Sequence, residues 1–290
     1  MRVMRWSWVV FGLAVLPSAT LPASTAPQSH DEGPIQLRLT FVESTPLTTV
    51  FIGTRAIRAI VDTSAGDADG ALTLSHDVIQ SAGGTRLGDA SMIDQQGRRF
   101  IRPRFRIPFV IVDGHVIRDV NVVEALPSAV ETAPSPNVIG KFFLSRYYVV
   151  IDFAAANVSL WPPQTQNPTG VDCGKTAIPM ESTKEERLAV SAFDIPAGSV
   201  RLSWTTGASR SFLAETAATR LRLVTANGEA DGTKFLRPTT LSAAGRKFAP
   251  LEFVVLPLRL STDFDGMLGR DFFDQHLVCL DYQRREVRVR

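Results

Sequence analysis

The sequence has few of the residues that build metal centres and redox sites. It contains two cysteines and four histidines among 290 residues. The histidines (His30, His76, His115 and His276) stand far apart and lack the close ligand spacing that is typical of zinc sites. We therefore expect no metal and no other cofactor.

An excess of charge of one sign is also missing. The formal net charge is +2, and no block of basic residues occurs. Domains that bind nucleic acid usually concentrate Lys and Arg on one face or along one helix. Nucleic acid is therefore not an expected partner. Lys is rare and Arg is frequent, a composition that suggests a GC-rich bacterial genome.

Long apolar runs are absent apart from one near the N-terminus. Arg2 and Arg5 precede the apolar run Trp6 to Leu16, and the small residues Ser24-Thr25-Ala26 follow it. This layout is typical of a secretory signal peptide, and the run is shorter than the ~20 residues that span a bilayer. We predict a signal peptide over residues 1–26, export to the periplasm or the medium, and no membrane span after its removal. The alternative is an uncleaved anchor.

The two cysteines would meet an oxidising compartment after export. An even number permits one disulfide, between Cys173 in a Pro- and Gly-rich linker and Cys279 near the C-terminus. The alternative is two buried thiols. The sequence leaves both outcomes open.

The two halves of the chain carry the same series of segments. Arg58 to Gly66 has the sequence RAIVDTSAG, and Arg201 to Ser209 has the sequence RLSWTTGAS. After each loop the same features follow in the same order: a helix-like stretch (74–79 and 212–217), a polar turn between strands (95–98 and 243–246), a hydrophobic-hydrophobic-Gly motif ending at Gly140 or Gly269, and a closing hairpin (149–160 and 278–289). Such self-similarity indicates an internal repeat.

This ordered set resembles the aspartic protease family, in its retropepsin-like and pepsin-like branches, as a bacterial exported two-lobed type with a degenerate second catalytic motif. The resemblance implies a mostly β fold of two tandem pseudo-symmetric acid-protease lobes. Each lobe would be a closed or partly open β-barrel with few short helices. We place an N-terminal arm and first strand at residues 27–46, the first lobe at 47–162, a linker at 163–186 and the second lobe at 187–290.

The resemblance also assigns roles to the two loops. Family members use two carboxylates that share one proton, one activating a water and the other hydrogen-bonding the substrate carbonyl. Asp62 stands at the first catalytic position, whereas Thr205 stands where the second acid belongs. A threonine hydroxyl does not ionise near neutral pH, so Thr205 cannot relay that proton. The resemblance gives Thr63 and Thr206 the role of interlocking the loops.

Four further residues are expected to support these loops. Gly207 keeps the family glycine after the threonine, but Ser64 replaces the first one, which would be costly if the turn required a positive φ. Gly140 and Gly269 close the hydrophobic-hydrophobic-Gly motifs.

The segment Gly66 to Gly70 lacks the downstream Glu and the ligand spacing of a calcium loop, so we expect a flexible turn there.

Three functions fit these observations. The first is an aspartic-type endopeptidase in which Asp62 works with Thr205 or with a nearby acid, Asp263 or Asp265. The second is a pseudo-protease that binds extended peptides or proteins between its lobes without cutting them, with flap-like hairpins near Gly97 and Gly245 lining the cleft. The third is an exported scaffold in which Asp62 only stabilises its turn.

Two further expectations concern chemistry and assembly. Ser75-His76-Asp77 is contiguous, which is not the geometry of a serine triad, and we interpret it as a helix start capped by Ser75. A peptide or protein is the expected partner. We expect a monomer, because the second lobe would already cover the face through which two Asp62 loops could pair.

Overall fold

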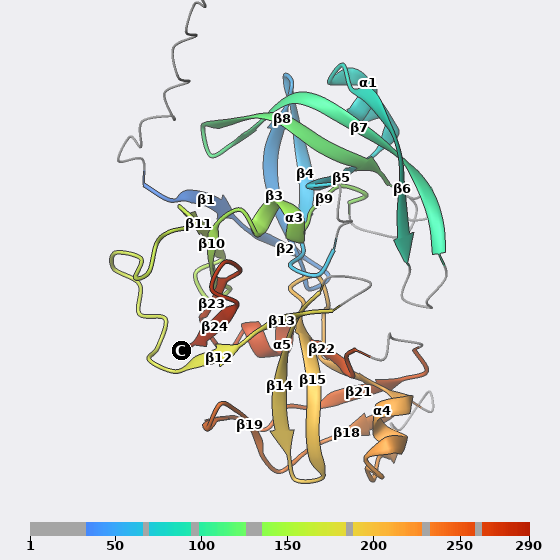
Figure 1. The fold of residues 1–290 in the computed structure, drawn as a ribbon, viewed down its shortest axis with the longest axis vertical. Coiled ribbons are helices and arrows are strands. Elements are labelled where there is room, and N and C mark those ends of the chain that lie inside the picture. Colours follow the sequence, from blue (N-terminus) through green and yellow to red (C-terminus); the bar gives the residue numbers. More distant parts are fainter. Residues whose placement is uncertain are drawn as a thin grey trace, which may run out of the picture. The chain divides into compact units, whose positions relative to one another are not determined.

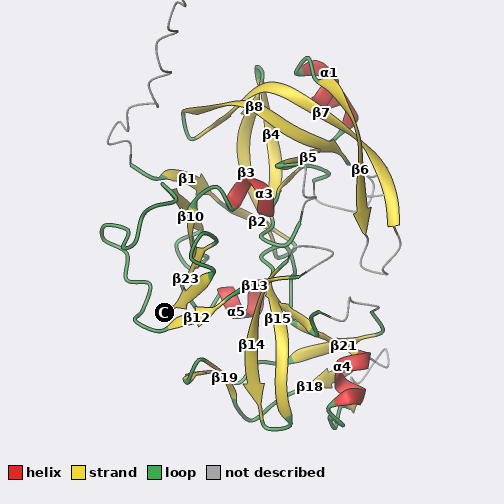
Figure 2. Ribbon diagram, viewed as in Figure 1, coloured by secondary structure: helices red, strands yellow, loops and turns green. Residues whose placement is uncertain are grey.

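The chain folds mainly into β-strands, which form three sheets connected by loops and a few short helices (Figures 1 and 2). The computed structural model describes residues 33–65, 70–93, 99–125, 135–183, 188–227, 233–258 and 263–290. The predicted signal peptide, Gly97 and residues 66–69 lie outside this part. The fold class predicted from the sequence is confirmed.

The first half builds an eight-stranded sheet with the order β2-β3-β4-β9-β5-β8-β7-β6. Its elements are β2 (Thr40–Val42), β3 (Thr45–Ile52), β4 (Arg55–Val61), β5 (Leu72–Leu74), β6 (Thr85–Ile93), β7 (Arg99–Val112), β8 (His115–Glu124) and β9 (Val138–Ile139), with helices α1 (His76–Ser81) and α3 (Lys141–Leu144). Along β4, buried and exposed side chains largely alternate, as expected for a strand with one face on a core. We call this sheet with its helices the first lobe.

The second half builds a ten-stranded sheet with the order β17-β18-β21-β16-β22-β15-β14-β19-β20 and with β13 beside β14. Its elements are β13 (Glu181–Ser182), β14 (Ala189–Ile195), β15 (Gly198–Trp204), β16 (Phe212–Ala214), β17 (Ala226–Asn227), β18 (Lys234–Leu236), β19 (Leu241–Ala243), β20 (Arg246–Phe248), β21 (Phe253–Leu256) and β22 (Gly266–Leu268), with helices α4 (Glu215–Arg220) and α5 (Arg270–Phe273). We call this sheet with its helices the second lobe.

Equivalent strands pair in the same way in both lobes. β4 lies parallel to β9, and β15 lies parallel to β22. β5 then pairs antiparallel with β9, as β16 does with β22. The repeat inferred from the sequence is therefore also a repeat of strand pairing, and it brings the loop after β4 and the loop after β15 to equivalent places.

The closing hairpins of the two halves join in a third, six-stranded sheet. Its order is β1-β11-β10-β23-β24-β12, from β1 (Ile35–Arg38), β10 (Tyr148–Asp152), β11 (Asn157–Trp161), β12 (Ala177–Pro179), β23 (Val278–Asp281) and β24 (Glu286–Val289). The antiparallel pair β10 and β23 connects the halves directly. Residues of both halves thus share one continuous sheet.

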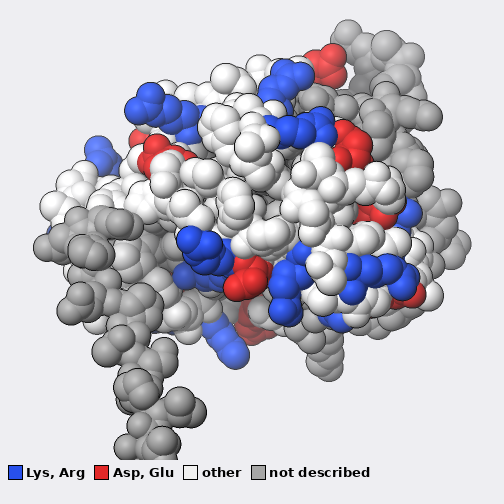
Figure 3. Space-filling model, turned by 90° about the horizontal axis from the view of Figure 1, so that it is seen from above, with Lys and Arg blue, Asp and Glu red and all other residues white. Residues whose placement is uncertain are grey.

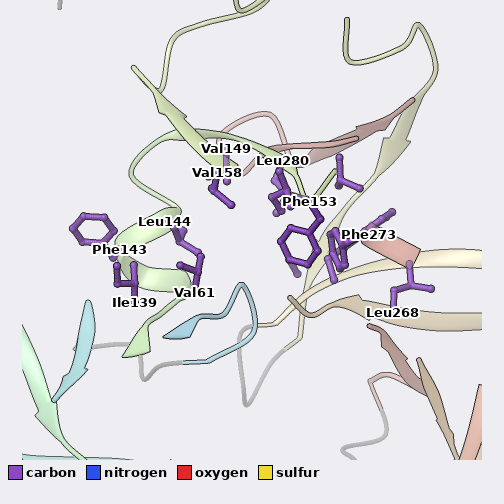
Figure 4. Packing of buried hydrophobic residues seen from close by; sticks show 14 of the residues in the cluster. Val61, Ile139, Phe143, Leu144, Val149, Phe153, Val158, Leu268, Phe273 and Leu280 are labelled. Carbon is purple, nitrogen blue, oxygen red and sulfur yellow. The ribbon is translucent and has the colours of Figure 1, made fainter. Parts of the chain in front are cut away.

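Buried apolar side chains of the two halves form one large cluster (Figure 4). The members labelled in the figure are Val61, Ile139, Phe143, Leu144, Val149, Phe153, Val158, Leu268, Phe273 and Leu280. Phe153 of the first half contacts Phe273 of the second, with ring centroids 5.6 Å apart. Val61 at the end of β4 and Leu268 at the end of β22 belong to this cluster. The core therefore lies beneath the loop that follows β4 and beneath the start of α5, which follows β22.

Three predicted elements differ in detail. The first strand, expected within residues 27–46, is two strands, because Leu39 N–H bonds the carbonyl of Ala156 and the chain passes from one sheet to another there. The helix-like stretches at 74–79 and 212–217 both begin as strands and turn helical later, at His76 and Glu215. β5 and β16 are buried at both ends, so their short apolar runs pair in a sheet instead of starting a helix.

Cys173 and Cys279 form a disulfide that fixes the linker to β23. The hydroxyl of Tyr148 lies 3.5 Å from Cys173 Sγ, inside a small apolar cluster. The bridge joins residues 106 apart in sequence. A crosslink of this span restricts the unfolded chain considerably.

Removing the bridge is therefore expected to lower stability substantially. The double variant Cys173→Ser, Cys279→Ser should lose about 2–5 kcal/mol of unfolding free energy, measured by urea denaturation without reductant. A loss below about 0.5 kcal/mol would show that the linker is held by its other contacts alone.

The described residues contain no helix that is long and apolar enough to cross a membrane.

Candidate active site

Two threonines lock the loops of the two lobes together. The hydroxyl of Thr63 donates to the carbonyl of Trp204 at 2.6 Å and accepts the N–H of Thr206 at 3.1 Å. In return the hydroxyl of Thr206 donates to the carbonyl of Val61 at 2.8 Å and accepts the N–H of Thr63 at 3.0 Å. Both threonines are almost completely buried. We call these four hydrogen bonds the threonine interlock.

The strands behind each loop hold it in the same way. Asp62 N–H donates to Ile139 at 3.1 Å, and Thr205 N–H donates to Leu268 at 3.0 Å. At the next helix, Lys141 N–H reaches the carbonyl of Ala65 at 2.7 Å. The equivalent bond in the second lobe runs from Arg270 N–H to Ala208 at 2.8 Å.

Gly140 and Gly269 are the residues immediately before α3 and α5, at their N-caps. A Cβ on Gly269 would lie 2.4 Å from the backbone of Arg210, so no larger residue fits without movement. Gly269 N–H also donates to the hydroxyl of Ser211 at 2.9 Å. Gly269 thus lets α5 pack directly against the chain that follows the second loop.

Asp62 is half-buried, and its carboxylate is held by hydrogen bonds from both loops. Ser64 donates to Asp62 Oδ1 twice, from its N–H at 2.9 Å and from its hydroxyl at 2.8 Å. The N–H of Gly207 in the other lobe also bonds the carboxylate. Ser64 does not have a positive φ, so replacing the family glycine causes no backbone strain here.

Gly207 is required for space. A Cβ at this position would lie 2.3 Å from Asp62 Oδ2, far inside contact distance. Gly207 does not have a positive φ, so its backbone conformation alone does not require a glycine. The second loop therefore lies directly against the carboxylate of the first.

Thr205, at the position of the missing acid, does not turn its hydroxyl to Asp62. Its Oγ1 lies 3.1 Å from Ser203 Oγ, and both side chains are buried. Of the two other acids considered from the sequence, Asp265 is engaged elsewhere. Asp265 accepts the N–H of Arg201 at 2.9 Å and the guanidinium of Arg220 at 2.6 Å, and Asp263 has contacts of its own.

Burial raises the pKa of the Asp62 carboxyl, and the hydrogen bonds from Ser64, Gly207 and Ala65 oppose this shift. No second carboxylate among the described residues contributes to it. The causes of the raised Asp62 pKa therefore differ from those in a pair of neighbouring carboxylates, where the like charge of one raises the pKa of the other.

A titratable neighbour that the sequence did not single out is Tyr282, directly after β23. Burial raises the pKa of its phenol, and the negative charge of Asp62 adds to the effect. Its hydroxyl is buried and has no hydrogen-bond partner among the described residues. No local sequence pattern marks this residue, because its relation to Asp62 arises from the third sheet.

The raised pKa of Asp62 predicts a pH-dependent stability. The folded state holds the Asp62 proton more tightly than the unfolded chain, whose Asp pKa is about 3.9. The stabilising effect is complete below that value and is lost as the pH rises through the folded pKa. Asp62→Asn should therefore gain stability relative to the native chain as the pH rises from about 3.5 to about 7, measured by urea denaturation. A constant difference across this range would contradict the assignment.

The hairpin with Gly245 at its turn was expected from the sequence to line a cleft between the lobes, but its described contacts lie away from the Asp62 loop. Ala244 and Gly245 both have positive φ and join β19 to β20. Phe248 of this hairpin packs on Phe272 and His276, at and just after α5. The contacts described for this hairpin are with β14, α5 and the linker, and none is with the Asp62 loop.

The Ser75-His76-Asp77 segment behaves as the start of a helix. Ser75 is the N-cap residue by position, although its hydroxyl donates to Asp77 Oδ1 at 2.6 Å instead of capping the backbone. His76 Nδ1 lies 3.3 Å from Glu124 Oε2. The three side chains therefore do not form a relay.

The fold is that of known acid proteases. The solved structure of an aspartic proteinase from Irpex lacteus is similar to this chain, with a TM-score of 0.58, and the similarity covers 89% of this chain and 97% of that one. The two sequences are 11% identical over this similarity, so it shows the fold alone. No protein-family model matches the sequence, and no curated protein matches it.

Proposed function

We propose that this protein is a pseudo-protease that binds extended peptides across its paired loops and does not cleave them. The observation that carries the proposal is the pairing of a complete threonine interlock with a single carboxylate. Thr63 and Thr206 hold the loops as a two-lobed acid protease requires, yet Thr205 has no ionisable group and its hydroxyl pairs with the hydroxyl of Ser203.

The chemistry of one carboxylate supports binding over catalysis. Asp62 alone can accept a proton from a water, but no described acid stands ready to donate one to the substrate carbonyl. General acid–base groups each contribute about 10²–10⁴-fold to a rate, so losing one of two is severe. A protonated Asp62 can still donate a hydrogen bond to a peptide carbonyl, which is a binding interaction.

The proposal extends to location and assembly. A leader over residues 1–26 would export the chain, and the Cys173–Cys279 disulfide suits an oxidising compartment such as the bacterial periplasm or the medium. We propose that the protein acts there as a monomer, since the second lobe supplies the loop that a second subunit would otherwise bring.

Hydrogen exchange of the purified protein with a bound peptide tests the proposal. A pool of extended ten-residue peptides is screened for binding, and the tightest is added at saturation. We expect slower exchange of amides in the loops at 62–65 and 205–208 and in the β6–β7 hairpin. Protection confined to other segments, or the absence of any bound peptide in the pool, would overturn it.

A further inference from the structure

Three arginines stand at alternate positions of β7. They are Arg102, Arg104 and Arg106, and alternate residues of a strand point to the same face. This strand and β6 form the long hairpin of the first lobe. We call these residues the arginine row.

The strand pairing shows which face the row occupies. Arg104 lies opposite Val123 of β8, and directly opposite residues share a face. The Val123 side chain points toward Gly70, where an added Cβ would lie 2.4 Å from Val123 Cγ2. Gly70 is the first residue described after the Asp62 loop. The arginine row is thus on the face of the sheet that carries the Val123 side chain, beside Gly70.

The outer members of the row differ in exposure. Arg102 is half-buried and donates from Nη2 to the carbonyl of Ala125 at 2.5 Å, and its Nε is buried without a partner among the described residues. Arg106 is exposed, and its Nε lies 3.4 Å from Asn121 Oδ1, a long hydrogen bond. Arg104 has contacts of its own, so Arg102 and Arg106 are the members of the row expected to bind a ligand.

The acid of the hairpin does not neutralise the row. Among the described residues of β6 and β7, Asp89 is the single acid, and it pairs with Arg86 at 2.5 Å. Asp89 lies opposite Pro103 and Arg86 lies opposite Phe105, so this ion pair is on the other face. The Arg86–Asp89 ion pair therefore does not offset the charge of the arginine row.

We propose that the peptides bound by this protein are acidic, with Asp or Glu side chains held by the arginine row. A guanidinium presents a planar fork of donors that matches a carboxylate, and such charge-assisted bonds are stronger than neutral ones. On the face of the molecule seen in Figure 3, basic and acidic side chains are interspersed, so that face is no general anion surface. The inference rests on the proposed function and adds the class of ligand to it.

Fluorescence anisotropy with matched peptides tests the inference. One labelled peptide carries Glu at alternate positions, a second carries Gln at the same positions, and a third carries Lys. We expect the Glu peptide to bind about tenfold more tightly than the Gln peptide at low salt, since hydrogen bonds to charged groups contribute about 1.5–3 kcal/mol. The preference should shrink as salt is added.

Charge-reversing variants locate the selectivity. Arg102→Glu and Arg106→Glu should each remove most of the preference for the Glu peptide while leaving Gln-peptide affinity unchanged. Arg106 is exposed, so its variant remains informative if Arg102→Glu does not fold. Arg118→Glu is the matched control, because Arg118 is also exposed on this sheet but lies near the β7–β8 turn.

The outcomes separate this inference from the proposed function. Equal affinity for the Glu and Gln peptides would overturn the acidic preference and leave peptide binding intact. Binding of none of the peptides would overturn both. Equal loss of the preference in Arg118→Glu, or equally tight binding of an oligonucleotide of the same charge, would show general attraction to polyanions and would also overturn the inference.

Discussion

Thr205→Asp is expected to turn this protein into an acid-optimum protease. The loop of Thr205 is already in place, since Gly207, two residues further on, lies against the Asp62 carboxylate. An aspartate at 205 would put two carboxylates on interlocked loops, where like charge makes the pair share one proton. We expect peptide cleavage at least about 10²-fold above the native chain, measured by mass spectrometry of a digested peptide library at about pH 3–5.

Two control variants make this experiment decisive. Thr205→Asn has the size of the aspartate without its charge and should stay inactive. Thr205→Asp combined with Asp62→Asn should also be inactive, because one carboxylate is again missing. A folded but inert Thr205→Asp would show that residues beyond the two loops have also been lost from the catalytic machinery. Equal activity in Thr205→Asn would show that charge is not the missing element.

Thr206→Val should destabilise the fold strongly. Valine keeps the branched shape but leaves the N–H of Thr63 and the carbonyl of Val61 without partners in a buried site. Each unsatisfied buried group costs about 1–3 kcal/mol, so the expected loss is about 2–5 kcal/mol of unfolding free energy. Urea denaturation measures it.

The exposed strand residue Thr49 provides the control. Thr49→Val changes the same atoms on the surface of β3 and should alter stability by less than about 0.5 kcal/mol. Thr63→Val together with Thr206→Val should cost less than the sum of the single changes, because the two residues share the interlock. A loss below about 1 kcal/mol for Thr206→Val would show that the lobes are held together without the interlock.

The repeated loop pattern made much of the fold predictable. The order of segments is local information. It survives although the sequence is 11% identical to that of the aspartic proteinase from Irpex lacteus. The structure joins the lobes through Thr63 and Thr206, the residues that the pattern singled out. The internal repeat also placed Asp62 and Thr205 at equivalent strand ends.

Other features depend on pairing that a single sequence does not show. The step at Leu39 between two sheets follows from a backbone bond to Ala156, far along the chain. The space requirement at Gly207 exists only because Asp62 of the other lobe approaches it. The alternation of arginines in β7 was visible in the sequence, but its face is set by the register with β8.

The most direct test of the account is incubation of the native protein with a peptide library across about pH 3–7, beside Asp62→Asn. Mass spectrometry detects both cleaved products and peptides that remain bound. We expect the native protein to retain peptides and to yield no cleavage above that of Asp62→Asn. Cleavage by the native chain that disappears in Asp62→Asn would contradict it and would make Asp62 the acid of a working protease with an unrecognised partner.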